Sequence, residues 1–233
     1  MYEEFIKRTD IKEFAKYIDH TLLKPQLTVD DVKKAINDYR KYNFATLVLN
    51  PYYVNVIKKL NINDIILCSV VGFPLGFNST KVKVLEAKEL LEQGVREIDM
   101  VMNINAFKSR DYSYVVNDIR AVVEVAKTYN AIVKVIIETG LLTDEEKVKA
   151  VDLIINAGAD FVKTSTGFIA GGATVHDVKL LKETARGRIK VKAAGGIRHA
   201  YDAIAMIIAG ADRIGTSTGV QIVEEYMSLK RRI

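Results

Sequence analysis

The sequence contains few of the residues that build disulfides, linkers and metal sites, with one cysteine, three prolines and three histidines in 233 residues. The single cysteine, Cys68, excludes a disulfide within the chain and is typical of a reducing compartment, so we expect a cytoplasmic location. Its apolar neighbours in "ILCSVV" favour a packed thiol. The N-terminal segment mixes acidic and basic residues and lacks the apolar core of a signal peptide.

Long apolar runs and single-sign charge runs are also scarce. No apolar run approaches the roughly 20 residues of a membrane-spanning helix. The formal charge is +5, but lysines and acids are interspersed and only the terminal "KRR" forms a basic run. Nucleic-acid binding would require a basic face with aromatic platforms or a known module. We therefore expect neither a membrane nor a nucleic-acid partner, while the surplus of lysine suits small anionic molecules.

Motifs for metals and nucleotides are missing. His20, His176 and His199 lie far apart in the sequence and lack the spacing of a zinc site. No glycine-rich GxGxxG or GxxxxGK motif follows a predicted strand. We expect neither a metal nor a cofactor, which leaves the chemistry to the side chains of the protein itself.

Short apolar segments alternate with longer amphipathic ones along the whole chain. The predicted strands are 17–19, 45–50, 64–71, 97–101, 132–138, 161–163, 189–193 and 213–215. The predicted helices are 29–41, 51–59, 79–93, 112–128, 144–156, 175–184, 200–209 and 220–229. Eight apolar strands, each followed by a helix, predict an α/β fold with an all-parallel sheet, a (β/α)8 TIM barrel. A doubly wound open sheet is the alternative.

The domain organisation follows from the same pattern. No stretch rich in proline, glycine and serine separates one part of the chain from another, so we expect a single barrel domain over residues 1–233. An amphipathic segment precedes the first strand. We expect residues 1–16 to form an extra N-terminal helix that caps the base of the barrel.

An internal repeat supports the barrel. "AGADFVKTSTG" (157–167) recurs as "AGADRIGTSTG" (209–219), with a weaker copy, "QGVREIDMVMN" (93–103). In each copy a glycine ends a helix and a strand follows. Alignment of the copies makes Asp99, Lys163 and Gly215 equivalent positions on strands four, six and eight, so we expect them at one height near the top. The fold accepts glycine there and does not itself require a lysine or an acid.

Two lysines end neighbouring predicted strands on the face where barrel enzymes carry their active sites. Burial and the like charge of Lys192 would both disfavour the protonated form of Lys163, and we expect Lys192 to act chiefly through this charge while also taking part in proton transfer. A neutral lysine amine attacks carbonyl groups and forms a Schiff base. Asp99 would offset the remaining charge and move protons. An inert Lys–Asp pair that fills the barrel mouth is the alternative.

The loops after the last strands, "AAGGIR" (193–198) and "GTSTG" (215–219), favour an anion. Glycine lets the backbone approach a ligand closely, and N–H groups at a helix start bind phosphate. Together with the "TSTG" after strand six they predict a phosphate site built from Thr166, Gly167, Gly195, Gly196, Gly215, Ser217 and Thr218. Ordinary turn chemistry would explain the same composition.

Two further acidic residues follow or end strands. Asp19, next to His20 in "IDHTLL", would either contact a substrate hydroxyl or brace the top of the barrel. Glu138, in "IIETGLL", is expected to help hold the lysine cluster, in a structural or a catalytic role.

Seven segments together resemble the deoxyribose-phosphate aldolase family, in order and from about residue 17 to 220. They are "IDHTLLKP", "VVGFPLG", "EIDMVMNI", "VKVIIETGLL", "FVKTSTGF", "VKAAGGIR" and "RIGTSTG". The resemblance implies a class I aldolase on a (β/α)8 barrel that needs no metal. It implies reversible cleavage of 2-deoxy-D-ribose 5-phosphate to acetaldehyde and D-glyceraldehyde 3-phosphate, in a homo-oligomer that is a dimer or a tetramer.

The resemblance also implies roles for individual residues. Lys163 matches the Schiff-base lysine, Lys192 the second lysine and Asp99 the acidic residue of the proton relay. The phosphate-binding loops of the family match Gly167, Gly195, Gly196, Ser217 and Thr218.

The chain departs from the family at three points. Phe168 stands where many relatives have lysine, "VLNP" (48–51) replaces "CVNP", and a C-terminal tyrosine is missing. The alternatives to this activity are a Schiff-base aldolase with another donor and a catalytically silent phosphosugar-binding barrel. Retention of Lys163, Lys192 and Asp99 together argues against the silent barrel.

Overall fold

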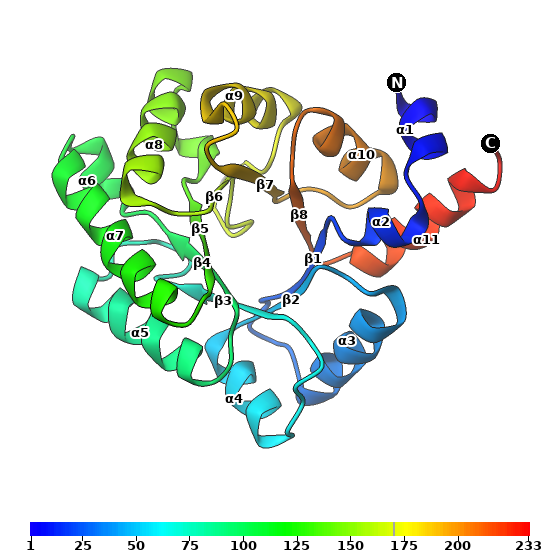
Figure 1. The fold of residues 1–233 in the computed structure, drawn as a ribbon, viewed down its shortest axis with the longest axis horizontal. Coiled ribbons are helices and arrows are strands. Elements are labelled where there is room, and N and C mark those ends of the chain that lie inside the picture. The colour runs from blue at the N-terminus through cyan, green and yellow to red at the C-terminus, as the bar shows by residue number, and fades with distance from the viewer. Residues whose placement is uncertain (170) are drawn as a thin grey trace.

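Eight parallel strands form a closed barrel at the centre of the protein, whose computed structural model describes residues 1–169 and 171–233. The strands pair in chain order, and β1 also pairs with β8, which closes the ring (Figure 1). They are β1 (Ile18–Leu22), β2 (Thr46–Leu49), β3 (Leu67–Val71), β4 (Glu97–Val101), β5 (Ile132–Ile136), β6 (Phe161–Lys163), β7 (Lys190–Ala194) and β8 (Arg213–Thr216). The predicted TIM barrel is confirmed, and the open sheet is wrong.

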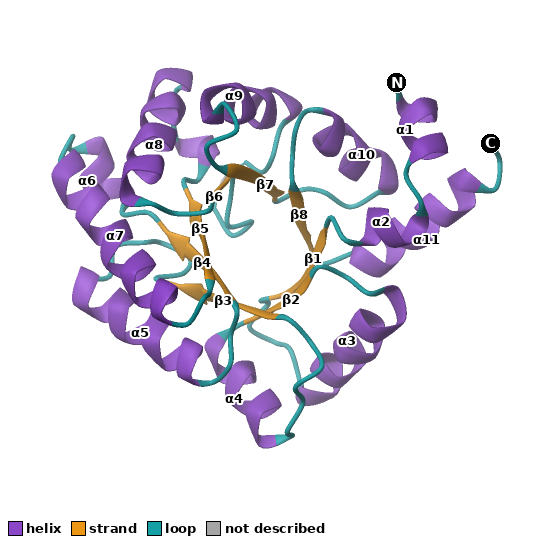
Figure 2. Cartoon of the chain, viewed as in Figure 1, coloured by secondary structure: helices purple, strands orange, loops and turns teal. Residues whose placement is uncertain are grey.

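The helices form a ring around the strands (Figure 2). Those that follow strands along the chain are α3 (Val29–Tyr42), α4 (Pro51–Lys59), α5 (Thr80–Glu92), α7 (Tyr112–Thr128), α8 (Asp144–Ala157), α9 (Val175–Ala185), α10 (Ala200–Ile208) and α11 (Gly219–Lys230). The sequence did not predict the short helix α6 (Ile104–Lys108) or the single 3-10 turn η1 (Thr139–Leu141). No helix within the described part of the chain has both the length and the apolar character needed to cross a membrane.

The glycines of the internal repeat end helices as expected. Gly94, Gly158 and Gly210 have φ angles of 95°, 82° and 115°, a left-handed conformation that residues with a side chain rarely adopt. Each lies just after a helix and a few residues before β4, β6 or β8. The repeat therefore corresponds to one structural unit, a helix end followed by a strand of the barrel wall.

The N-terminal segment forms two helices where one was expected, α1 (Tyr2–Arg8) and α2 (Ile11–Ala15). The break has a local cause, because the backbone of Thr9 is extended and the side chain of Asp10 accepts a hydrogen bond from the Glu13 N–H at 2.7 Å. In Figure 1 both helices lie beside α11, and the rings of Phe14 and Tyr226 stack with centroids 3.8 Å apart. A capping role over the base, and a single domain over 1–233, stay predictions.

The strands present different residues to the two faces of the barrel wall. Outward-facing residues join the apolar core beneath the helices, as Ile98, Val133, Val162, Val191 and Ile214 do on β4 to β8. The residues next to them in the sequence are charged and meet inside the barrel: Asp99, Lys134, Lys163, Lys192 and Arg213. Because strand side chains alternate between faces, this pattern places an ionic layer within a buried lumen.

Candidate active site

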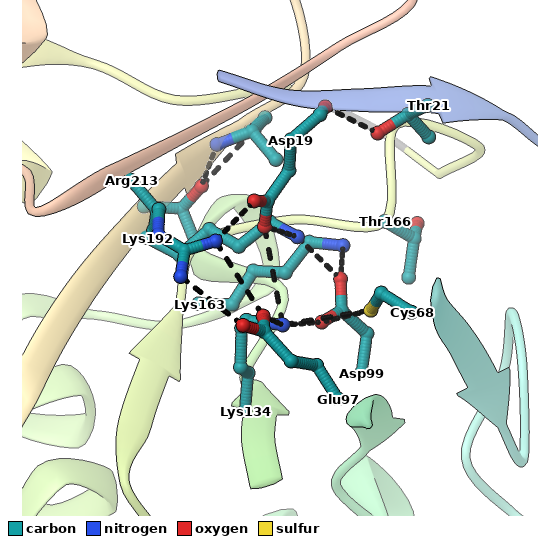
Figure 3. Close-up of polar contacts among 12 residues, drawn as sticks. Asp19, Thr21, Cys68, Glu97, Asp99, Lys134, Lys163, Thr166, Lys192 and Arg213 are labelled. Carbon is teal, nitrogen blue, oxygen red and sulfur yellow. Dashed lines mark hydrogen bonds and ion pairs between the residues drawn. The ribbon is translucent and has the colours of Figure 1, made fainter. Parts of the chain in front are cut away.

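Asp99 holds the two predicted lysines together (Figure 3). Its Oδ2 atom accepts hydrogen bonds from the Nζ atoms of Lys163 and Lys192, each at 2.7 Å. Asp99 and Lys192 are fully buried and Lys163 is 3% exposed. The structure thus brings the three predicted catalytic residues into direct contact around one carboxylate oxygen.

The strand register explains this meeting. Lys163 and Lys192 are paired positions on the neighbouring strands β6 and β7. Space for the second side chain comes from β8, because a Cβ atom on Gly215 would lie 3.0 Å from Cε of Lys192. A larger residue at this point of the repeat would therefore crowd the Lys192 side chain in the lumen.

Lys134 is a third buried lysine in the cluster, and the sequence analysis missed it. Its Nζ atom lies 3.0 Å from Asp99 Oδ1 and 2.6 Å from Glu97 Oε2. Arg213 contacts the same Glu97 carboxylate at 3.1 Å. A lysine in the middle of the apolar strand "VKVII" was the available signal, but only residues at strand ends were considered as site candidates.

Asp19 belongs to the ionic layer. Its fully buried carboxylate lies 2.6 Å from Lys192 Nζ and 2.5 Å from a guanidinium nitrogen of Arg213. These contacts correspond to the bracing role, and Asp19 is not among the residues that line the cavity described below. Cys68 also reaches the cluster, with its thiol 3.3 Å from Asp99 Oδ1.

The environment lowers the pKa of one of the three lysines and raises the pKa of the other two. Burial lowers the pKa of Lys163, and the charge of Lys192 lowers it further against the opposing effect of Asp99. Burial also disfavours charged Lys134 and Lys192, but nearby carboxylates outweigh it and raise the pKa of both. Lys192 was expected to lower the pKa of Lys163 as a neighbouring positive charge. The charge of Lys192 acts in that direction, and burial is the larger cause.

Acid should weaken the fold through Asp19. Burial alone would raise its pKa, but Lys192, Lys134 and Arg213 together lower it from 3.8 to about 2. A depressed pKa stabilises the folded state above pH 4, and this contribution is lost as the pH falls toward 2. We expect a loss of about 2 kcal/mol of unfolding free energy over that window. Urea unfolding at pH 5 and pH 2.5 measures it, with Asp19→Asn as the comparison; equal pH dependence in both proteins would contradict the assignment.

A cavity of about 920 Å³ opens beside Lys163. It is lined by all seven predicted phosphate-site residues: Thr166, Gly167, Gly195, Gly196, Gly215, Ser217 and Thr218. Gly195 and Gly196 have φ angles of 90° and 79°, which their loop requires. Within the described residues, the backbone N–H groups of Gly196 and Ser217 make no hydrogen bond. An amine and unpaired backbone donors therefore share one cavity, the combination that a phosphorylated carbonyl compound needs.

The loop after β6 is held by Glu138. Glu138 Oε2 accepts hydrogen bonds from the N–H of Thr166 at 3.1 Å and from its hydroxyl at 2.6 Å. Among the described residues Glu138 forms no ion pair with a lysine, so the expected role in holding the lysine cluster is wrong. The reason is its backbone: with φ at 52° it lies beyond the end of β5 and turns toward the loop. Phe168, the departure from the family, packs edge-on against Phe73 at 5.2 Å.

One group of potential metal ligands lies outside the barrel. Asp144, His176 and Asp177 place ligand atoms within 4.8 Å of one another. The Nζ atom of Lys147 lies 3.0 Å from Asp144 and 2.7 Å from Asp177, so an ammonium group already neutralises these carboxylates. The group is best described as a surface ion-pair network between α8 and α9.

The chain is similar to known aldolases along most of its length. Residues 14–225 match the DeoC/LacD family of aldolases. A protein named deoxyribose-phosphate aldolase from Clostridium tetani is 54% identical over 214 residues, which cover 91% of this chain and 99% of that protein. One of the same name from Thermococcus kodakarensis is 54% identical over 216 residues, covering 91% and 96%.

Solved structures agree with these sequence relatives. The tetrameric deoxyribose phosphate aldolase from Aeropyrum pernix superimposes with a TM-score of 0.90 at 38% identity, over 98% of this chain and 97% of that one. An aldolase called QR15 superimposes with a TM-score of 0.89 at 44% identity, over 95% and 99%. The matched region contains all eight strands and every residue of the lysine cluster. The chain belongs to the DeoC/LacD family of aldolases.

Proposed function

We propose that this chain is a class I deoxyribose-phosphate aldolase, which reversibly cleaves 2-deoxy-D-ribose 5-phosphate to acetaldehyde and D-glyceraldehyde 3-phosphate. The observation that carries the proposal is the single oxygen of Asp99 that accepts from Lys163 and Lys192 at 2.7 Å each, beside the cavity. The relatives at 54% identity that bear this enzyme's name support the choice of substrate.

The reaction begins at Lys163. Its lowered pKa increases the fraction of neutral amine, which attacks the C1 carbonyl carbon of the open-chain sugar phosphate. Two proton transfers to the former carbonyl oxygen release it as water and leave an iminium between C1 and Nζ. The iminium withdraws electrons from C2, which prepares the bond between C2 and C3 to break.

Carbon–carbon cleavage follows from loss of the C3 hydroxyl proton. The C2–C3 electron pair moves into the iminium and gives an enamine, while C3 becomes the aldehyde of glyceraldehyde 3-phosphate. Protonation of the enamine at C2 and addition of water release acetaldehyde and restore the amine. Asp99 and Lys192 move these protons through a water. The raised pKa of Lys192 keeps it charged, as a proton donor. Despite burial, the lysines hold the pKa of Asp99 well below its ordinary value, so Asp99 is ionised and can accept a proton.

The phosphate is bound by the loops after β7 and β8. The unpaired N–H groups of Gly196 and Ser217 and the N-terminus of α11, which begins at Gly219, are suited to an anion. Inorganic sulfate should therefore compete with substrate.

A negative charge at Ser217 should weaken binding of the phosphate group and leave binding of the sugar little changed. We expect Ser217→Asp to raise KM for deoxyribose 5-phosphate by about tenfold or more, since tenfold corresponds to only about 1.4 kcal/mol of lost binding. KM for unphosphorylated deoxyribose should change little. Ser113→Asp, in the exposed first turn of α7, adds the same charge away from the cavity and serves as the control. An equal rise in KM for both substrates would place the phosphate site elsewhere.

A cleavage assay tests the proposed activity itself. Acetaldehyde and glyceraldehyde 3-phosphate should appear in equal amounts from deoxyribose 5-phosphate. Binding of the sugar phosphate without either product would instead indicate a silent phosphosugar-binding barrel. A carbonyl fragment other than acetaldehyde, from another sugar phosphate, would indicate an aldolase with a different donor.

We also propose that the chain assembles into a homo-oligomer, a dimer or a tetramer. The proposal is supported by the Aeropyrum pernix relative, whose structure is described as tetrameric. Light scattering on the purified chain measures the assembly directly. The cytoplasmic location stays a prediction from the cysteine content.

A further inference from the structure

The charged groups inside the barrel form a closed ring. Six of them alternate in sign, and each contacts the next: Arg213–Asp19 at 2.5 Å, Asp19–Lys192 at 2.6 Å, Lys192–Asp99 at 2.7 Å, Asp99–Lys134 at 3.0 Å, Lys134–Glu97 at 2.6 Å and Glu97–Arg213 at 3.1 Å. Figure 3 shows the side chains converging from strands on opposite sides of the lumen. Three carboxylates and three cations give the ring no net charge.

Lys163 is a seventh group attached to this neutral ring. Its Nζ atom contacts only one member, Asp99, whose oxygens already face Lys192 and Lys134. Protonation of Lys163 therefore adds an uncompensated charge to a buried site, where charge is costly. Each other cation of the layer contacts at least two carboxylates of the ring.

The remaining groups near the lumen do not offset that charge. Cys68, on β3, is buried and its pKa is raised, so the thiol is neutral. Burial lowers the pKa of His20 to about 4, so the imidazole of His20 is uncharged at neutral pH. Glu138, after β5, directs Oε2 to Thr166 and forms no ion pair with Lys163 among the described residues. The wall segment of β2, Thr46–Leu49, carries no charged residue.

We propose that Glu97 and Arg213 are positioning residues that close this ring and so leave Lys163 as the odd cation of the lumen. The proposal rests on the Schiff-base function above. Neither residue lines the cavity, so neither reaches substrate. Both act through the ring, Glu97 by way of Lys134 and Arg213 by way of Asp19.

Opposite changes at one ion pair should shift the active form of Lys163 in opposite directions. Glu97→Gln leaves the lumen one charge more positive, so protonation of Lys163 becomes harder and its pKa should fall. Arg213→Met leaves the lumen one charge more negative, and the pKa should rise. We expect about one pH unit in each direction, the size for one unit charge within about 10 Å at the effective dielectric constant of protein sites.

The double variant and a surface pair supply the controls. Glu97→Gln with Arg213→Met restores neutrality, so the Lys163 pKa should return to within about 0.3 pH units of the parent. Arg40 and Asp64 form an exposed ion pair, with Nε to Oδ2 at 2.7 Å. Arg40→Met and Asp64→Asn change the same charges in solvent and should shift nothing. A purely structural role for Glu97 and Arg213 predicts no opposed shifts.

The measurement is the pH dependence of Lys163 acetylation by trace acetic anhydride, read by peptide mass spectrometry, because it reports the amine without requiring turnover. Opposed single shifts that cancel in the double variant support the proposal. Shifts of one sign, or none, in folded variants overturn it. If one single variant fails to fold, the other single and the double variant still decide. Absence of aldol cleavage in the parent would refute the function and leave the acetylation result intact.

Discussion

The Lys163→Met variant is expected to keep the fold and to lose cleavage of deoxyribose 5-phosphate by about 10⁴-fold or more, as for removal of a covalent nucleophile. Methionine nearly matches the length of the buried lysine stem but has no amine to form the iminium. The fold should survive because the closed ring of six charged side chains remains complete without Lys163.

Two comparisons make that result specific. Lys179→Met, on the exposed face of α9, removes a lysine whose ion-pair partner, Glu183, is equally exposed and should leave the rate unchanged. Circular dichroism and urea unfolding should place Lys163→Met within about 1 kcal/mol of the parent or above it, because an uncompensated charge is removed. A folded Lys163→Met protein that cleaves at more than a tenth of the parent rate would rule out covalent catalysis at this lysine.

Asp99→Asn should uncouple imine formation from turnover. The amide cannot act as a carboxylate base, so we expect kcat to fall by about 10³-fold, within the range of general acid–base catalysis. The pKa of Lys163 should fall further, because the charge and hydrogen bond of Asp99 raise it. The amine therefore stays nucleophilic and should still be trapped as an imine by borohydride. Loss of trapping together with turnover would assign Asp99 to activation of the amine instead.

The same substitution should have the largest effect on stability. It leaves Lys134 and Lys192 buried with one carboxylate fewer each and Lys163 with none. Removal of one partner from a buried ion pair costs about 3–5 kcal/mol. Urea unfolding at neutral pH measures this loss. The comparison is Asp118→Asn, which breaks a second buried pair, with Lys83 at 2.6 Å, away from the reacting groups. Asp118→Asn should lower the free energy of unfolding without lowering kcat of the protein that remains folded.

The barrel could be predicted because each unit of the sequence carries its own signals. Threonine caps at Thr28 and Thr143 begin helices, and left-handed glycines such as Gly158 end them. Apolar segments of three to eight residues, too short for a buried helix, favour strands of a parallel sheet. Local chemistry of this kind does not depend on partners distant in the sequence, so most predicted boundaries lie within a few residues of those observed.

The triad of Asp99, Lys163 and Lys192 was predictable for a similar reason. All three follow recognisable positions in the repeat or at strand ends, and parallel strands bring their ends to one face. The predicted phosphate-site residues, recognised as glycine and hydroxyl residues in loops after strands, line one cavity.

The rest of the ionic ring required the register. Glu97, Lys134 and Arg213 contact residues 35 or more positions away in the sequence or across the barrel, and only the closed sheet decides which side chains meet. The direction of Glu138 depended on a left-handed backbone that a side-chain pattern does not reveal.

The most direct measurement is reduction with sodium borohydride in the presence of acetaldehyde, followed by peptide mapping. Hydride reduces an iminium to a stable secondary amine, so one ethyl group should appear on Lys163, and activity should be lost in proportion to labelling. Lys134 and Lys192, whose pKa values are raised, should stay unlabelled. Ethyl groups confined to exposed lysines, or labelling of Lys192 in place of Lys163, would contradict the account.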